Sequence, residues 1–138
     1  MAMMNIENMT IKDYNYTTRK VYVMTNNKKI GEAIKNLREN IGYSQQNIAA
    51  FLQVDQSLVS KIEKGERNIS ADMLEKLACL FGVTKDSILN NSAVIKPLIF
   101  AFRGSGLTAD EMEIIRAINK IALNLEFMNK LLEEKNVW

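Results

Sequence analysis

Histidine is absent from this 138-residue sequence, and cysteine and proline each occur once, as Cys79 and Pro97. The lack of histidine removes the most common general base and the most common zinc ligand. A single cysteine excludes an internal disulfide and a multi-cysteine metal site, and the apolar neighbours of Cys79 indicate a buried structural thiol. We find no glycine-rich phosphate loop and no paired carboxylates. We therefore expect no enzymatic activity, no cofactor and no metal site.

Long apolar runs are also missing. No stretch approaches the ~18 residues that a membrane helix needs, and Asn5, Glu7 and Asn8 interrupt any signal-peptide core near the N-terminus. Hydrophobic residues make up 47% of the chain and charged residues 25%, which is typical of a globular protein. We therefore expect a cytoplasmic protein that has no contact with a membrane.

The charges nearly balance over the whole chain, which has a formal net charge of +2. This small excess does not by itself indicate a nucleic-acid-binding protein. The distribution is uneven, however, because residues 28–70 carry a net +2 and residues 104–138 carry a net −2. The two ends of the chain are therefore expected to have different roles.

Apolar periodicity and capping residues predict an all-α fold. Ile30, Ile34, Leu37 and Ile41 recur at 4-3-4 spacing and give a first helix one apolar face. Four further short helices are expected over residues 45–52, 56–64, 71–81 and 85–89, capped by Ser44, Asp55, Ser70 and Thr84. Together, residues 28–90 are predicted to form a five-helix domain.

The remaining segments are expected to be appendages of this domain. Residues 1–27 are interpreted as an N-terminal arm, within which residues 20–24 favour a short strand. Residues 91–107 contain Pro97 and are interpreted as a linker or docking segment, and the apolar stretch 98–102 fits either a strand or a docking segment. Residues 108–138 are expected to form a C-terminal helix for dimerisation or partner binding.

The second and third predicted helices are separated by only about three residues, so they should cross steeply. The third helix then keeps one polar stripe on its outer side, consisting of Gln56, Ser57, Ser60, Lys61 and Lys64. Glutamine can bond adenine bidentately, lysine can reach guanine, and serine adapts to either. Taken alone, the stripe fits both a solvated face and a DNA-contacting face.

Residues 28–90 resemble the DNA-binding domain of the lambda-repressor, Cro and Xre-like family. The similarity is carried by Ser44-Gln45-Gln46-Asn47-Ile48-Ala49, by the run from Val54 to Ser70 that contains Ile62-Glu63-Lys64-Gly65, and by Leu80-Phe81-Gly82-Val83. The resemblance implies a helix-turn-helix that binds double-stranded DNA. It departs from the family where Gln53 replaces the usual turn glycine and where Ile69 replaces a frequent proline.

The resemblance also implies residue roles. Base contacts are expected from Gln56, Ser57, Ser60 and Lys61, and backbone contacts from Ser44, Gln45, Lys64, Arg67 and Asn68. Gln45 would also brace Gln56. Arg38 and Glu63 are expected to form a structural ion pair between the first and third helices.

The C-terminal helix is predicted to begin with a capping box at Thr108 and Glu111. Its apolar residues follow a heptad-like seam of Ile114, Ile118, Ile121, Leu125, Met128 and Leu132, with a second line of Leu123, Phe127 and Leu131. The helix could pack back onto the first and fifth helices of its own chain, but two apolar lines favour burial between molecules.

The sequence thus predicts a dimeric repressor that binds a palindromic operator through its third helix. Segments around Ala101-Phe102-Arg103 and Ile118-Asn119-Lys120-Ile121 are weakly similar to C-terminal extensions of regulators from mobile elements and toxin–antitoxin loci. This similarity supports an alternative, an antitoxin or immunity-type repressor whose C-terminal region binds a toxin or protease.

Overall fold

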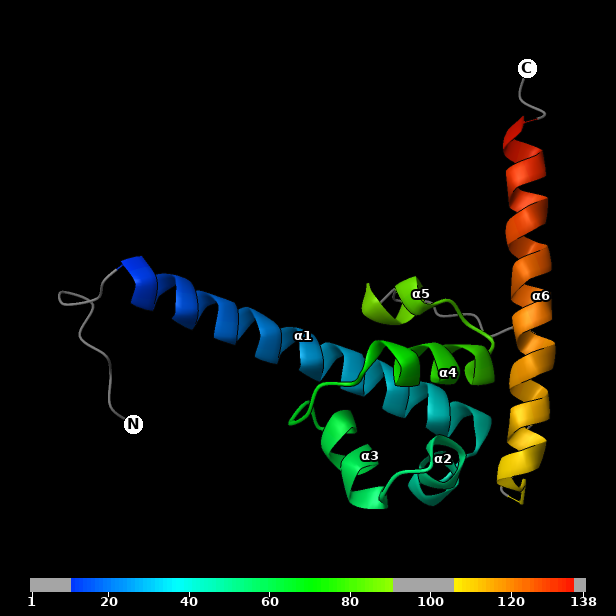
Figure 1. The fold of residues 1–138 in the computed structure, drawn as a ribbon, viewed down its shortest axis with the longest axis horizontal. Helices are drawn as coiled ribbons and strands as arrows, with labels where there is room; N and C mark the ends of the chain where they lie inside the picture. The colour runs from blue at the N-terminus through cyan, green and yellow to red at the C-terminus, as the bar shows by residue number, and fades with distance from the viewer. Residues whose placement is uncertain (1–10, 91–105, 136–138) are drawn as a thin grey trace.

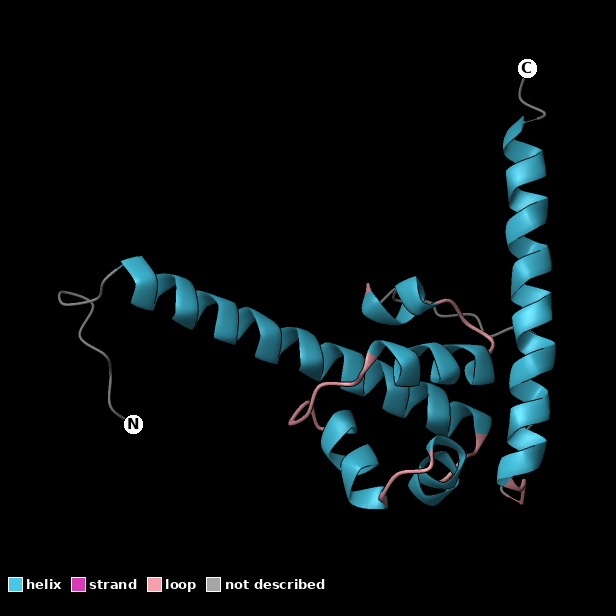
Figure 2. Ribbon diagram, in the orientation of Figure 1, coloured by secondary structure: helices cyan, strands magenta, loops and turns pink. Residues whose placement is uncertain are grey.

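The structure is a computed structural model that describes residues 11–90 and 106–135, with side chains from Asn26 onward. Within these ranges every regular element is a helix (Figure 2). The helices are α1 (Ile11–Ile41), α2 (Gln45–Leu52), α3 (Gln56–Glu63), α4 (Ala71–Phe81), α5 (Lys85–Leu89) and α6 (Ala109–Lys135). None of them is both long enough and apolar enough to span a membrane. The prediction of an all-α fold is confirmed.

Side-chain caps begin most of these helices where the sequence places them. The Ser44 hydroxyl accepts a 3.0 Å bond from the Asn47 amide, and the Asn47 side chain accepts a 2.8 Å bond from the Ser44 amide. Thr108 and Glu111 form the corresponding reciprocal pair at the start of α6. Asp55 lies at the N-cap of α3 as predicted, but its carboxylate makes no capping hydrogen bond, and the amide of Leu58 bonds to the backbone carbonyl of Asp55 at 3.0 Å.

The N-terminal segment differs from its prediction. Residues 20–24 are helical and belong to α1, so the predicted short strand is wrong. An isolated strand would leave its backbone groups without a partner strand, whereas extending an existing helix adds one hydrogen bond per residue. The first helix therefore starts well before residue 28. Residues 1–10 and most of the predicted linker at 91–107 lie outside the described residues.

Helices α2 to α5 and the C-terminal part of α1 enclose one apolar core. The side chains of Ile34, Ile48, Leu80, Phe81 and Ile88 are essentially inaccessible to solvent. The predicted apolar face of the first helix points into this core, since Ile30, Ile34, Leu37 and Ile41 are all buried. This part of the chain, residues 26–90, is called the body below.

Helix α6 packs mainly against α4 and α2, whereas one interpretation of the sequence placed it on the first and fifth helices (Figure 1). Its contact face consists of Met112, Ile115 and Asn119, all buried. The Asn119 amide donates a 3.1 Å bond to the carbonyl of Leu80, in the last turn of α4, where helix carbonyls lack intrahelical partners. Beyond this contact α6 continues past the body (Figure 1).

Candidate nucleic-acid interface

The turn between α2 and α3 sets the angle of the exposed helix α3. Gln53 adopts the left-handed conformation, with φ 57° and ψ 46°, and is the only non-glycine residue with positive φ in the described chain. The amide of Val54 closes the turn on the carbonyl of Ala49 at 3.0 Å. The backbone therefore takes a conformation that suits glycine, although glutamine pays a conformational cost for it.

Apolar side chains on the inner faces of α2 and α3 pack these two helices against each other. Ile48, Ala49 and Leu52 of α2 are buried, as are Val59 and Ile62 of α3. The small Ala49 lies at this joint, where a larger side chain would hold the two helices apart. The contacts that hold α3 in place are therefore made by its inner face.

The outer face of α3 is open to solvent. Gln56, Ser57, Lys61 and Lys64 are exposed, and Ser60 is partly buried. Gln56 also faces Gln45 at the start of α2, but the 3.5 Å between Gln56 Nε2 and Gln45 Oε1 makes this a weak contact. These hydrogen-bonding groups are therefore available to an external ligand.

A buried ion pair ties α3 to α1. Arg38 donates from Nε to Glu63 Oε1 at 2.6 Å and from Nη2 to Glu63 Oε2 at 3.0 Å. Arg38 Nη1 also donates to the carbonyl of Tyr43 at 2.8 Å. The bond with Glu63 raises the pKa of Arg38 above its ordinary value, so the guanidinium stays charged. Gln45 Nε2 completes the cluster with a 2.9 Å bond to Glu63 Oε2.

The loop after α3 carries the other predicted contact residues. Arg67 and Asn68 are exposed, and the amides of Glu66 and Arg67 both bond to the carbonyl of Lys61. The side chain of Asn27 donates to Asn68 across to α1. This bond places the loop beside both α3 and α1.

Two features of the site escaped the sequence analysis. Gly31 of α1 lies so close to α3 that an added Cβ would stand 2.3 Å from the carbonyl oxygen of Ile62 and 2.7 Å from that of Glu63. A glycine inside an apolar helical pattern signals such a close approach. Two lysines of α1, Lys28 and Lys35, also line a hollow that adjoins the outer face of α3.

Cys79 has the structural role that its neighbours indicate. It is buried and unpaired, and burial raises the pKa of its thiol, which disfavours the reactive thiolate. The described residues also contain no group of three acidic or cysteine side chains placed to hold a metal ion.

Comparison with known proteins gives this arrangement a family. The helix-turn-helix family model matches residues 34–88, which run from α1 through α5. A protein from Saccharolobus islandicus named as an HTH-type transcriptional regulatory protein is 39% identical over 75 residues, covering 50% of this chain and 24% of its own. One from Saccharolobus solfataricus is 30% identical over 103 residues, covering 61% and 33%.

The control protein C.MunI of a Mycoplasma species is 34% identical over 64 residues, which is 46% of this chain and 86% of that protein. The chain spans only a quarter to a third of the length of the Saccharolobus relatives. No solved structure matches it. The matched residues are those that build the crossed helices α2 and α3 and their support, and this chain therefore belongs to the Xre-like family of helix-turn-helix transcriptional regulators.

Proposed function

We propose that the chain is a sequence-specific repressor that binds a palindromic operator as a dimer, with α3 in the major groove. The observation that carries this proposal is the division of α3 into two faces. Val59, Ile62 and Glu63 are buried, while the opposite side presents a polar stripe to solvent. A helix that is packed through its inner face and exposes glutamine and lysine side chains on its outer face is suited to contact bases in DNA.

Within this proposal, the polar residues separate into two groups. Gln56, Ser57, Ser60 and Lys61 contact base edges, because they occupy the outer face of α3. The DNA backbone is bound by residues that flank this face, namely Ser44, Gln45, Lys64, Arg67 and Asn68. Base contacts carry the sequence information, whereas phosphate contacts mainly orient the protein.

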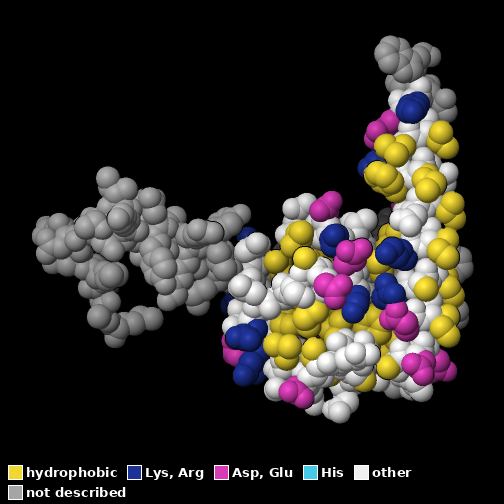
Figure 3. All heavy atoms as spheres, viewed as in Figure 1, with side chains coloured by type: hydrophobic (Ala, Val, Ile, Leu, Met, Phe, Trp, Pro, Cys, Tyr) yellow, Lys and Arg dark blue, Asp and Glu magenta, His cyan; other side chains and the backbone are white. Residues whose placement is uncertain are grey.

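The dimer is proposed to form through α6. Its seam of Ile114, Ile118, Ile121, Leu125, Met128 and Leu132 is between 44% and 63% exposed in the single chain. Figure 3 shows apolar side chains along the projecting part of this helix. A contiguous apolar surface of this kind is unusual on a monomer and marks an interaction site.

The borders of the seam favour a second copy as the occupant. In the heptad register of the seam, the flanking positions between Ile118 and Leu132 hold Ala122, Asn124, Asn129 and Leu131, none of which is charged. Two such helices can therefore pair without burying a charge or opposing like charges. The nearby charged residues Lys120, Glu126, Lys130 and Glu133 lie outside these flanking positions.

The alternative function, an antitoxin or immunity-type repressor with a protein partner, is supported by the second apolar line of α6. Phe127 and Leu131 are 63% and 44% exposed, and with Leu123 they border a hollow beside Thr84 and Asp86 at the start of α5. A two-helix dimer along the seam reaches Leu131 at its border but leaves Leu123 and Phe127 uncovered. The dimer remains the primary proposal, because pairing of two α6 helices accounts both for the exposed apolar seam and for the absence of charge at its borders.

The first experiment measures the DNA sequence and the stoichiometry. Selection of duplexes from a random pool should give a palindrome with half-sites about one helical turn apart, roughly 10 base pairs centre to centre. Light scattering should show a dimer at micromolar concentration. A monomer that binds one per duplex would contradict the dimer, and a monomer that binds no duplex would favour the protein-partner alternative.

A second experiment compares Gln56→Ala with Lys64→Ala on the selected duplex and on a scrambled duplex. Gln56→Ala should cost about 1–3 kcal/mol on the selected duplex and relax the preference at one base pair. Lys64→Ala should weaken both duplexes equally and lower the salt slope by about one per subunit. Equal weakening of both duplexes by Gln56→Ala would show that α3 does not contact bases as proposed.

A further inference from the structure

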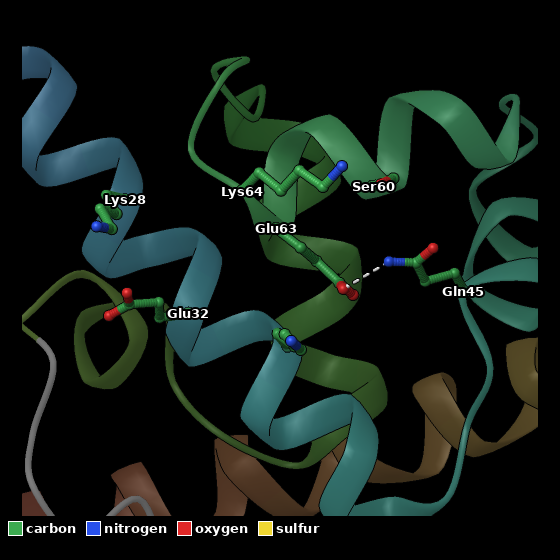
Figure 4. Close-up of a pocket in the computed structure, with 7 residues that line it drawn as sticks. Lys28, Glu32, Gln45, Ser60, Glu63 and Lys64 are labelled. Carbon is green, nitrogen blue, oxygen red and sulfur yellow. Dashed lines mark hydrogen bonds between the residues drawn. The ribbon is translucent and has the colours of Figure 1, made fainter.

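A hollow of about 330 Å³ lies between α1 and α3, beside the proposed base-contacting face (Figure 4). It is lined by Lys28, Glu32, Lys35, Gln45, Ser60, Glu63 and Lys64. Gln45 and Ser60 already belong to the proposed interface, so the hollow is a continuation of that interface towards α1. The lysines of α1 at this position have no role in the family resemblance described above.

A close backbone contact and one side-chain hydrogen bond bring α1 to this place. The loop glycine Gly65 lies so close to α1 that an added Cβ would stand 2.7 Å from Cα of Lys28. The bond between Asn27 and Asn68 joins the same two segments. The backbone of Lys28 in α1 is therefore held against Gly65, next in sequence to Lys64, the residue that directly follows α3.

The charges around the hollow favour an anion. Lys28, Lys35 and Lys64 form no ion pair with any other residue in the described part of the chain, whereas Lys76, Lys85 and Lys120 each pair with a carboxylate. Of the two glutamates, Glu63 is already neutralised by Arg38 at 2.6 Å. The start of α2, where Gln45 lies, adds the positive end of a helix dipole.

We propose that this hollow binds a phosphate of the DNA backbone, with Lys28 and Lys35 of α1 as cationic contacts beside Lys64. The proposal rests on the proposed function and extends the DNA-binding surface from α3 and its loop to α1. Lys28 and Lys35 are seven residues apart, so both lie on one face of the helix, with Glu32 between them at i+4 and i−3. Glu32 is the one glutamate lining the hollow for which the described part of the chain shows no ion pair, since Glu63 is bound by Arg38.

The test measures binding of the full chain to the selected duplex and to a scrambled duplex of equal length across a salt series. The variants are Lys28→Gln and Lys35→Gln, and the matched control is Lys29→Gln, an exposed lysine of α1 that does not line the hollow. Each lost phosphate contact should lower the salt slope by about 0.9 per subunit and weaken binding about tenfold near 0.1 M salt. Both duplexes should be affected equally, and Lys29→Gln should leave the slope unchanged.

The opposite sign is expected for Glu32→Gln, which removes a negative charge from the hollow and should tighten binding to both duplexes several-fold. Glu133→Gln on α6 is its control, since Glu133 is exposed and far from the hollow along the chain. Thermal unfolding followed by circular dichroism shows whether each variant is folded. A variant that unfolds would be replaced by Lys28→Met or Lys35→Met, which keep the length of the side chain.

Two failures can be told apart. If Lys28→Gln and Lys35→Gln behave like Lys29→Gln while Lys64→Ala still lowers the salt slope, the phosphate site on α1 is wrong and the proposed function stands. If Glu32→Gln weakens binding, the hollow does not hold an anion. If the unmodified chain binds neither duplex, the proposed function itself is wrong.

Discussion

The body buries its apolar side chains, whereas helix α6 exposes most of its own. In the body, Ile48, Leu80, Phe81 and Ile88 have no accessible surface, and Leu89 is its one large exposed hydrophobic residue among those described. On α6, only Met112 and Ile115 are buried apolar residues, while Ile121 and Phe127 are each 63% exposed. Burial of apolar surface is the main favourable term in folding. The body therefore buries nearly all of its apolar side chains, with Met112 and Ile115 of α6 completing the core, whereas most of the apolar surface of α6 stays exposed in the single chain.

This contrast separates two tasks within one chain. The body holds α3 at a fixed angle through a buried ion pair, a close backbone contact and an apolar joint. Helix α6 buries Met112, Ile115 and Asn119 against the body near its N-terminal end, and most of its remaining apolar side chains are exposed. Mutations in the body should therefore change the stability of a single chain, and mutations along most of α6 should change its association.

The largest effect is expected where the body buries charge. Glu63→Ala removes the main partner of the Arg38 guanidinium, which keeps a contact with only one carboxylate, that of the exposed Glu39 at 3.4 Å, in a site where the side chains of Glu63 and Arg38 are only 2% and 9% exposed. We expect a loss of about 3–5 kcal/mol in the free energy of unfolding. Glu66→Ala, in the exposed loop, is the control and should change it by less than about 0.5 kcal/mol. Equal effects in chemical denaturation would show that the pair does not anchor α3.

The contrast within α6 is tested by two methionines. Met112 is fully buried against the body and Met128 is 56% exposed. Met112→Ala should cost about 2–5 kcal/mol, because it opens a cavity between α6, α4 and α2. Met128→Ala should cost less than about 0.5 kcal/mol at protein concentrations where the chain is monomeric.

Raising the protein concentration sharpens this test. If α6 pairs with a second copy, the melting temperature of the unmodified chain rises with concentration, and Met128→Ala reduces that rise. A melting temperature independent of concentration in both proteins would contradict burial of the seam between copies.

The close contact between α1 and α3 predicts a smaller effect. Gly31→Ala places a Cβ against the backbone carbonyls of Ile62 and Glu63, which cannot rotate away as a side chain would. We expect a loss of about 1–3 kcal/mol from overpacking, together with weaker DNA binding because α3 is displaced. Gly106→Ala is the control, since an added Cβ there meets nothing within 4 Å. Comparable unfolding curves for the two variants would contradict this contact.

The smallest effect is expected at the turn. Gln53→Gly should stabilise the body by about 0.5–1 kcal/mol, because glycine adopts the left-handed conformation without the steric cost that glutamine bears. Ala50→Gly, at an exposed position of α2, should instead destabilise by about 1 kcal/mol. Urea denaturation of both variants measures the two changes in the free energy of unfolding. A loss of stability on Gln53→Gly would mean that the glutamine side chain stabilises the body by more than its left-handed backbone conformation destabilises it.

The helices of the body could be predicted closely because local signals specify them. Ser44, Ser70 and Thr84 each accept a hydrogen bond from the amide three residues later, at the positions that the sequence indicates. Asp55 shows the limit of this approach, since the residue type suits a cap but the local backbone satisfies the amide first. Residue type gives a preference, and the geometry of the turn decides whether it is used.

Features that depend on packing between distant segments could not be predicted as well. The sequence indicates the seam of α6 because many apolar residues repeat along it. The face that contacts the body has only Met112, Ile115 and Asn119, at i, i+3 and i+7. That spacing is visible in the sequence, but nothing local identifies α4 and α2 as its partners. The extended α1 was missed because the β-branched and aromatic residues at 20–24 favour strands, and this preference cannot act without a neighbouring strand.

The carbonyl oxygens of Ile62 and Glu63 that lie against Gly31 belong to the main chain of α3, and they are present whatever side chains that helix carries. The position of α3 is therefore set independently of the four outward residues Gln56, Ser57, Ser60 and Lys61. This independence makes the body a suitable framework for protein engineering. A library varied at these four positions should keep the fold, and if they contact bases as proposed, screening it against altered duplexes should yield variants with new DNA preferences.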